Sequence, residues 1–251
     1  MSTPYTYLVR TINGQFDIKA IPIGPSIPIQ YQGLRNLITS KPPWGIYDAT
    51  MWNSSTNTLP ELRGNGRNVT SGGTITFGTA SGNGSTASIS YVAGGTGSTL
   101  TWPSGSIPTN YTICTISRYI SGGTNRRIVQ STGTLNWLHG HWNGLRGVVY
   151  YGDAVGWMTQ SSTSVGTLTN WLVTCGKNGG TLPNNILIDG VASGTNNGGV
   201  GNAQLCINVP YEQSDWQFSY AIIWDQTLTD SELVSVSNAL QYYLTSGIKI
   251  I

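Results

Sequence analysis

The stretch that decides the fold reads NWLVTCGK at 170–177, NILIDGV at 185–191, AQLCINV at 203–209 and WQFSYAIIWD at 216–225. Gly and Asn residues that favour turns separate these four apolar segments, and a helical pattern comes only after the last of them. Short strands joined by such turns are typical of an antiparallel, all-β domain. This order of segments therefore predicts the fold class of the chain.

The one strong helix is predicted at residues 230–244. Thr229 and Glu232 have the spacing of a capping box, and Gly247 is suited to end the helix. An apolar face at helical spacing comprises Leu233, Val236, Leu240, Tyr243 and Leu244. The polar face carries Ser, Asn and Gln where a membrane-surface helix would carry Lys and Arg. We therefore expect this helix to pack on the β domain.

The strand pattern extends back from this stretch to about Trp44. Strand candidates are 74–79, 87–92, 98–102, 111–119, 127–131, 135–142, 146–151, 171–176, 185–189, 203–209 and 216–224. Apolar residues alternate even inside the Gly-rich segment 64–105, which favours hairpins with glycine turns over a disordered linker. We predict an all-β fold over residues 41–251, a two-sheet antiparallel jelly-roll sandwich with one short C-terminal helix.

Residues 1–40 differ from the rest and are predicted to form an extended N-terminal arm. Prolines alternate with isoleucines in this arm: Ile21, Pro22, Ile23, Pro25, Ile27, Pro28 and Ile29. Because proline fixes φ and lacks an N–H donor, we expect a polyproline-like segment that rises about 3.1 Å per residue. Two interpretations stay open, an edge segment lying across the domain itself and a docking arm for a neighbouring subunit.

The composition points away from electrostatic partners. Charged residues make up 9% of the 251 residues and the net charge is +2, whereas about 25% is typical of soluble domains. Arg126 and Arg127 form no basic patch, so nucleic acid is not an expected partner. The sequence instead suits a dense assembly of subunits or contact with neutral polymers such as glycans.

The cysteines and the N-terminal residues indicate where the protein folds. Cys114, Cys175 and Cys206 are an odd set without C-x-x-C spacing, and we interpret them as buried apolar residues. One disulfide with a free thiol is the alternative. Residues 1–10 show no signal-peptide pattern, and no run approaches ~18 apolar residues. We expect synthesis without a signal peptide in a reducing compartment, and no membrane insertion.

Catalytic patterns are missing from the sequence. A glycosidase needs two carboxylates about 5–9.5 Å apart, but Glu212 and Asp215, at three residues' separation, would face opposite sides of a strand. The chain has no G-x-S-x-G, and its two histidines share one strand. We therefore predict a protein that is not an enzyme.

Metal-binding patterns are weak. His139 and His141 would share a strand face with Asp153 nearby, which we interpret as polar residues on a solvent-facing strand. Asp48, Asp153 and Asp189 are the acids available to a calcium ion, but they form no cluster. We predict no metal site and no cofactor, while Ca²⁺ stays open.

The best candidate for ligand binding is the region 135–157 with the arginines before it. The candidate residues are Arg118, Trp137, His139, His141, Trp142, Arg146, Tyr151 and Trp157. Flat aromatic faces beside Arg and His donors suit a pyranose ring, which offers C–H faces for stacking and hydroxyls for hydrogen bonds. The alternative is that these aromatics fill the core of the sandwich.

Several segments together resemble laminin-G-like domains of the concanavalin A-like lectin–glucanase superfamily. The segments that carry the resemblance are 44–52, 102–108, 111–119, 127–128, 136–142 with Gly147, 171–173, 189–191 and the final strand and helix. The resemblance implies a jelly roll of the variety seen in marine protists and large algal DNA viruses. Such domains usually bind ligands or serve as structural components. The Glu-x-Asp-x-Glu strand of the catalytic relatives has no match in this sequence.

Two classes of function stay open at this point. The first is a non-catalytic jelly-roll component of a particle surface, such as a minor capsid or surface protein of a virion, that contacts glycans and other protein subunits. The second is a stand-alone carbohydrate-binding lectin module, and a glycoside hydrolase is a distant third. In the first case the protein is expected on a virion or another extracellular particle.

Overall fold

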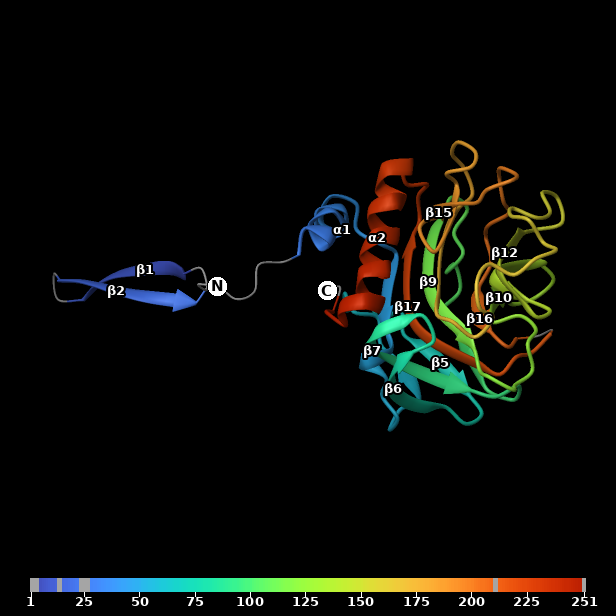
Figure 1. Ribbon diagram of the computed structural model, residues 1–251, viewed down its shortest axis with the longest axis horizontal. Coiled ribbons are helices and arrows are strands. Elements are labelled where there is room, and N and C mark those ends of the chain that lie inside the picture. Colours follow the sequence, from blue (N-terminus) through green and yellow to red (C-terminus); the bar gives the residue numbers. More distant parts are fainter. Residues whose placement is uncertain (1–4, 13–14, 23–27, 210–211, 250–251) are drawn as a thin grey trace.

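The protein is described by a computed structural model over residues 5–12, 15–22, 28–209 and 212–249. Figure 1 shows three layers: a pair of helices, a first antiparallel sheet, and a second antiparallel sheet on the far side. The helices are α1 (Ile29–Ser40) and α2 (Asp230–Ser246). The predicted two-sheet antiparallel sandwich with a C-terminal helix is confirmed.

The sheet next to the helices, called here the helix-side sheet, has the order β15-β14-β13-β9-β17-β7-β6, with β3 also paired to β17. Its strands are β15 (Val191–Ala192), β14 (Ile186–Ile188), β13 (Leu172–Lys177), β9 (Thr112–Tyr119), β17 (Trp216–Trp224), β7 (Ser85–Gly94), β6 (Thr76–Gly82) and β3 (Gly45–Asp48). A short 3₁₀ helix, η1 (Ala49–Met51), follows β3. Of the four segments that decided the fold class, three thus lie in this sheet as β13, β14 and β17, and the fourth forms β16 of the second sheet.

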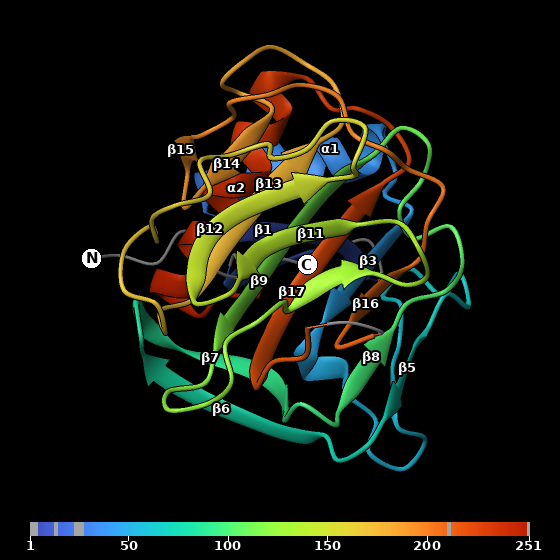
Figure 2. The same ribbon diagram turned by 90° about the vertical axis from the view of Figure 1, so that its right-hand side faces the viewer.

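The second sheet, called here the outer sheet, has the order β12-β11-β10-β16-β8-β5-β4 and faces the viewer in Figure 2. Its strands are β12 (Leu145–Tyr151), β11 (Trp137–Trp142), β10 (Val129–Ser131), β16 (Leu205–Ile207), β8 (Thr99–Thr101), β5 (Val69–Gly72) and β4 (Thr58–Leu59). Every predicted strand segment overlaps an observed strand. Within these two sheets, the strands that the sequence did not predict are short: β3, β4, β5 and β15.

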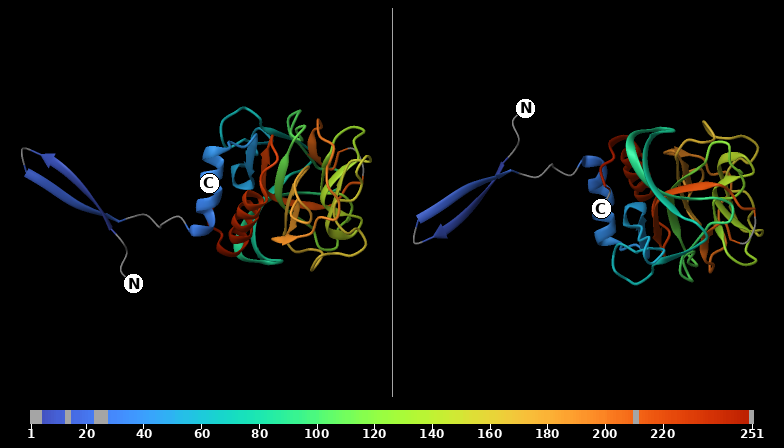
Figure 3. Two further views of the ribbon diagram at one scale, coloured as in Figure 1. Left: turned by 90° about the horizontal axis from the view of Figure 1, so that it is seen from above. Right: turned by 90° about the horizontal axis from the view of Figure 1, so that it is seen from below.

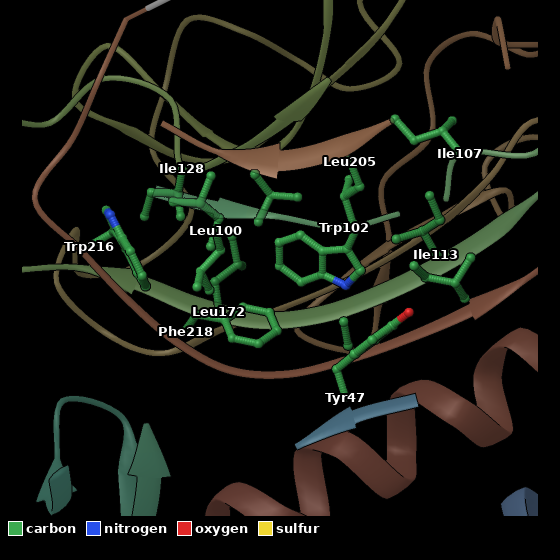
Figure 4. Packing of buried hydrophobic residues seen from close by; sticks show 14 of the residues in the cluster. Tyr47, Leu100, Trp102, Ile107, Ile113, Ile128, Leu172, Leu205, Trp216 and Phe218 are labelled. Atoms are coloured by element: carbon green, nitrogen blue, oxygen red, sulfur yellow. The ribbon is translucent and has the colours of Figure 1, made fainter. Parts of the chain in front are cut away.

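Two apolar clusters hold the layers together. Between the sheets, Trp102 packs edge-on against Tyr47 and Phe218, with ring centroids 5.8 and 5.4 Å apart (Figure 4). A second cluster joins the helix-side sheet to α1 and α2. Cys114, Cys175 and Cys206 are buried and unbridged, which confirms their interpretation as apolar residues.

Helix α2 has the predicted ends. Thr229 and Glu232 form a complete capping box. Gly247 ends the helix in the left-handed conformation, with φ of 66°, which a glycine adopts without steric strain. Among the described residues, neither helix is long and apolar enough to cross a lipid bilayer.

The N-terminal region differs from the predicted extended arm. Strands β1 (Tyr5–Ile12) and β2 (Gln15–Pro22) pair with each other as an antiparallel hairpin, and β2 includes Ile21 and Pro22. Residues 29–40 form α1, so the prediction is wrong there. Pro28 stands at the N-cap of α1, where its missing N–H costs no helical hydrogen bond, and Ile29 begins the helix 77% exposed. Ile23, Pro25 and Ile27 lie outside the described residues.

Helix α1 belongs to the body of the protein because it packs on α2. Tyr31 donates a hydrogen bond to the carbonyl of Ile248 at 2.8 Å, and its ring meets Tyr242 edge-on. Lys41, just after α1, pairs with Glu232 at 2.7 Å. Figure 3 shows α1 beside α2 from above and from below. The sequence signal was the apolar spacing of Tyr31, Leu34 and Leu37, which the neighbouring prolines obscured.

Candidate functional site

The inner face of β11 and β12 contains a stack of three rings. Trp137, His139 and Tyr151 are 0% exposed and nearly parallel, with interplanar angles of 7–10°. His139 Nε2 lies 3.1 Å from the carbonyl of Thr174, which can only accept, so Nε2 carries the proton. Nδ1 then accepts from the Tyr151 hydroxyl at 2.9 Å. Burial lowers the pKa of His139 to about 4. These rings form part of the core.

The next two candidates are buried as well, His141 by the alternation of β11 and Arg146 by a bulge in β12. The pairing of β11 with β12 shifts after Gly140, and Gly147 takes a φ of 88° there. Arg146 is turned inward, where it pairs with Asp189 and donates to three backbone carbonyls. His141 is 0% exposed, and neither of its ring nitrogens has a partner.

The prediction of a ligand surface is therefore wrong for five residues. Trp137, His139, His141, Arg146 and Tyr151 are all interior. The interpretation of the two histidines as residues of a solvent-facing strand fails for the same reason. Alternation along β11 points Trp137, His139 and His141 toward the core, and the extra residue Gly147 on β12 turns Arg146 inward.

The outer face of the same hairpin presents a different group of aromatics. Trp142, Tyr150 and Trp157 are half-buried and touch one another. The ring centroids of Trp142 and Trp157 are 5.1 Å apart at an interplanar angle of 56°, and those of Tyr150 and Trp157 are 5.2 Å apart at 80°. A β-bridge between Tyr150 and Trp157 holds the loop after β12 against the strand. Two predicted residues, Trp142 and Trp157, thus lie together at the surface.

Polar side chains close this group into a ring of contacts. Trp142 Nε1 donates to Glu212 at 3.2 Å, and Glu212 pairs with Arg127. The contacts continue from Arg127 to Asn136 at 2.8 Å, from Asn136 to Asp153 at 2.9 Å, and from the Tyr150 hydroxyl to Asp153 at 2.9 Å. We call these seven residues the aromatic–polar ring: Arg127, Asn136, Trp142, Tyr150, Asp153, Trp157 and Glu212.

The aromatic–polar ring borders an open hollow. The hollow has a volume of about 200 Å³ and is lined by Arg127, Gln130, Ser131, Thr134, Leu135, Asn136 and Glu212. Its wall offers guanidinium and amide donors beside carboxylate and hydroxyl acceptors. The hydrogen bond to the Asp153 carboxylate raises the pKa of Tyr150, so its hydroxyl remains a donor. The arrangement can stack apolar faces and hydrogen-bond hydroxyls at one place.

Sequence reasoning reached only part of the aromatic–polar ring. Asn136 was missed entirely, and Glu212 and Asp153 were considered only as catalytic or metal-binding acids. The signal available in the sequence was the alternation of side chains between the two faces of a strand. Trp142 on β11 and Tyr150 on β12 are an odd number of residues from the buried Trp137 and Tyr151, so they face the other way. The contact to Glu212, 70 residues from Trp142, has no local signal.

The remaining predicted residue, Arg118, lies elsewhere. It belongs to β9 of the helix-side sheet, and its guanidinium lies over the ring of Trp171 at 4.8 Å. It therefore does not contribute to the aromatic–polar ring.

The acids considered for catalysis or metal binding have other partners. Asp48 accepts from the Thr50 amide at the start of η1, and Asp189 holds Arg146. Glu212 is bound by Arg127 and Trp142, and Asp215 accepts from the Thr124 amide at 2.6 Å. In the described part of the chain, no three His, Cys, Asp or Glu residues gather as a metal site would require.

No protein-family model and no curated protein matches this sequence. Solved structures match the fold at low identity. Domain 4 of AbnA, a GH43 extracellular arabinanase from Geobacillus stearothermophilus, in complex with arabinotriose, is 16% identical over 77% of this chain and 97% of that one, with a TM-score of 0.49.

Two further structures reach a TM-score of 0.50. A mutant of Trypanosoma rangeli sialidase displaying trans-sialidase activity is 10% identical over 96% of this chain and 43% of that one. The binding domain of Paraclostridial Mosquitocidal Protein 1 is 12% identical over 78% of this chain and 52% of that one. The chain thus spans only about half of either protein or less, and the likeness supports an antiparallel β fold. The narrower resemblance to protist and viral copies stays a prediction.

Proposed function

We propose that the protein is a non-catalytic glycan-binding module whose ligand lies on the aromatic–polar ring. The observation that carries this proposal is the closed set of contacts that joins Trp142, Tyr150 and Trp157 to carboxylate, amide and guanidinium groups beside an open hollow. Aromatic faces stack on sugar C–H faces, and the polar groups match hydroxyls. A binding role also fits the mosquitocidal protein's binding domain, which has a similar fold.

The tilt of the aromatic planes suggests the kind of glycan. At 56° and 80°, the three rings offer no flat platform. A flat crystalline polysaccharide would need coplanar rings, whereas a single chain whose sugars turn relative to one another can meet tilted ones. The proposed ligand is therefore a soluble, single-chain oligosaccharide.

We propose that the site binds its ligand without catalysing a reaction. Glu212 is neutralised by Arg127 and Asp215 is used by a backbone amide, so neither is paired with a second carboxylate in the way hydrolysis requires. No cofactor is invoked, because Asp153, the ring's other acid, already accepts two hydrogen bonds from side chains.

Replacing Trp142 with alanine is expected to weaken glycan binding about 30-fold, since truncating an aromatic anchor costs on the order of 2 kcal/mol. A glycan array on the wild type identifies the sugar, and calorimetry then compares the variants. Trp157→Ala should behave alike, while Trp52→Ala, a half-buried tryptophan after η1, serves as the matched control. EDTA should leave the affinity unchanged. Absence of binding to every arrayed sugar would refute the proposal.

A second role, as a subunit of a particle surface such as that of a virion, is favoured by the N-terminal hairpin. Strands β1 and β2 form a sheet of their own, outside both sheets of the sandwich. A two-stranded hairpin alone is marginally stable in water, so a neighbouring subunit would stabilise it. The buried, unbridged cysteines support synthesis in a reducing compartment.

Deleting residues 1–27 is expected to abolish assembly while leaving glycan binding and the melting temperature unchanged. The cut precedes α1, whose contacts with α2 are part of the body. Light scattering behind size exclusion compares the particle mass of the two proteins. If the truncated protein assembles as the full chain does, the hairpin has no role in assembly.

A further inference from the structure

Three cationic side chains are buried in the described part of the chain, and one of them has no counter-ion. Arg146 pairs with Asp189, and Lys177 pairs with Asp230, each at 2.5 Å. Arg118 is only 9% exposed, yet no ion pair joins it to a carboxylate of the described residues. Of the three, only Arg118 is therefore open to an anion from outside the described residues, with which its guanidinium would form charge-assisted hydrogen bonds.

The contacts of Arg118 fix its position and leave donors free. Nε donates to Gln217 Oε1 at 2.5 Å, Nη1 donates to the Thr169 carbonyl at 3.4 Å, and the guanidinium plane lies over Trp171. Tyr91 packs on the same indole, with ring centroids 5.9 Å apart. A guanidinium has five N–H donors, so three of them have no partner among the described residues. Desolvation lowers the pKa of Arg118, and a bound anion would relieve that cost.

Arg118 is the first of a row of cross-strand neighbours that ends at a second hollow. Register places Arg118 opposite Gln217, Gln217 opposite Ala93, and Ala93 opposite Thr76, so these residues share one face of the helix-side sheet. Thr76 and Ala93 line an open hollow of about 470 Å³, together with Thr74, Gly94, Gly95, Ser98, Ile120 and Asp215. Cation, aromatic rings and hydroxyl-lined hollow therefore lie along one face.

The charges along this row differ from one end to the other. Asp215, in the hollow, would repel an anion and accept hydrogen bonds from hydroxyls, whereas Arg118 attracts an anion. A ligand that fits both carries one anionic group at the Arg118 end and hydroxyls over the hollow. Acidic sugars have this combination of groups.

We propose that Arg118 and Gln217 bind the carboxylate or sulfate group of an acidic glycan, with the next sugar lying over the hollow beside Thr76. This second site lies on the face of the sandwich that bears the helices, opposite the aromatic–polar ring. It goes beyond the function proposed above and is independent of it.

Calorimetry with glucuronosyl-glucose, a disaccharide with a single carboxylate, with its methyl ester and with acetate tests the site. Glucuronosyl-glucose should bind the wild type at least about tenfold more tightly than the uncharged ester or acetate does, because it alone offers both a charge to Arg118 and a sugar to the hollow. Arg118→Gln should lose that advantage. Arg126→Gln, at an exposed arginine bound to Asn143, and Trp142→Ala should keep it.

Three results would overturn the proposal: equal affinity for the acid and its ester, unchanged binding by Arg118→Gln, or acetate binding as tightly as glucuronosyl-glucose. The last would mean a general anion site and not one for an acidic glycan. Should Arg118→Gln fail to fold, Gln217→Leu provides the test, because it keeps the charge and removes the group that orients it. Glucuronosyl-glucose should raise the melting temperature of the wild type and not that of Gln217→Leu.

Discussion

Replacing Arg146 with methionine is expected to lower the free energy of unfolding by about 3–5 kcal/mol, the usual cost of removing one partner of a buried ion pair. Its guanidinium donates to the carbonyls of Asn170, Val165 and Trp171 and pairs with Asp189. Methionine fills much of the volume but satisfies none of these acceptors. Such a loss is a large fraction of the roughly 5–15 kcal/mol that stabilises a domain.

Urea denaturation monitored by tryptophan fluorescence measures this effect. Arg126→Met, at an exposed arginine, is the matched control and should change stability by less than about 0.5 kcal/mol. The double variant Arg146→Met with Asp189→Leu should recover part of the loss, because it no longer leaves a carboxylate without its partner. A loss below about 1 kcal/mol for Arg146→Met would show that these bonds contribute little.

Acid is expected to destabilise the protein from about pH 6.5 downward because of its two buried histidines. Desolvation lowers the pKa of His139 to about 4, and desolvation together with the charge of Arg146 holds the pKa of His141 well below its usual value. Unfolded histidine has a pKa near 6.5, so below that pH the unfolded chain binds protons that the folded chain excludes. The stabilising contribution is therefore complete above pH 6.5 and falls by up to about 1.4 kcal/mol per histidine for each pH unit below it.

Denaturation midpoints between pH 7.5 and pH 5 test this, since most carboxylates titrate below that range. His141→Phe should halve the slope, because only His139 then remains. This variant also removes two ring nitrogens that have no partner, so it should fold. A flat stability profile across this range would mean that the histidines take up protons while the protein stays folded.

The strands and α2 could be predicted because their signals are local. Alternation of apolar residues located every long strand of the two sandwich sheets, and the Thr229–Glu232 box located the start of α2. Helix α1 was missed because Pro22, Pro25 and Pro28 precede it, and because its stability comes from packing on α2. Strands of two to four residues, such as β4, carry too few residues to show a period.

The sequence located the region of the candidate site but not which of its side chains face the surface. The region 135–157 was identified, and Trp142 and Trp157 do lie at the surface. Which of its side chains face outward depends on strand phase and on the bulge at Gly147, and the sequence does not show where a bulge occurs. Arg118 illustrates another limit. It lies on the helix-side sheet because β9 pairs with β17, and its partner there, Gln217, is 99 residues away in the sequence.

The placement of α1 gives the molecule a front and a back. Tyr31 of α1 bonds to Ile248, so the chain emerges at residue 28 and reaches residue 248 on the same side, behind the helix-side sheet (Figure 3). Trp142 and Trp157 are on the other side, which Figure 2 views directly. A fluorophore, a biotin or a solid support attached beyond either end would leave the tryptophans open to solution, so the protein can be immobilised on a sensor without masking them.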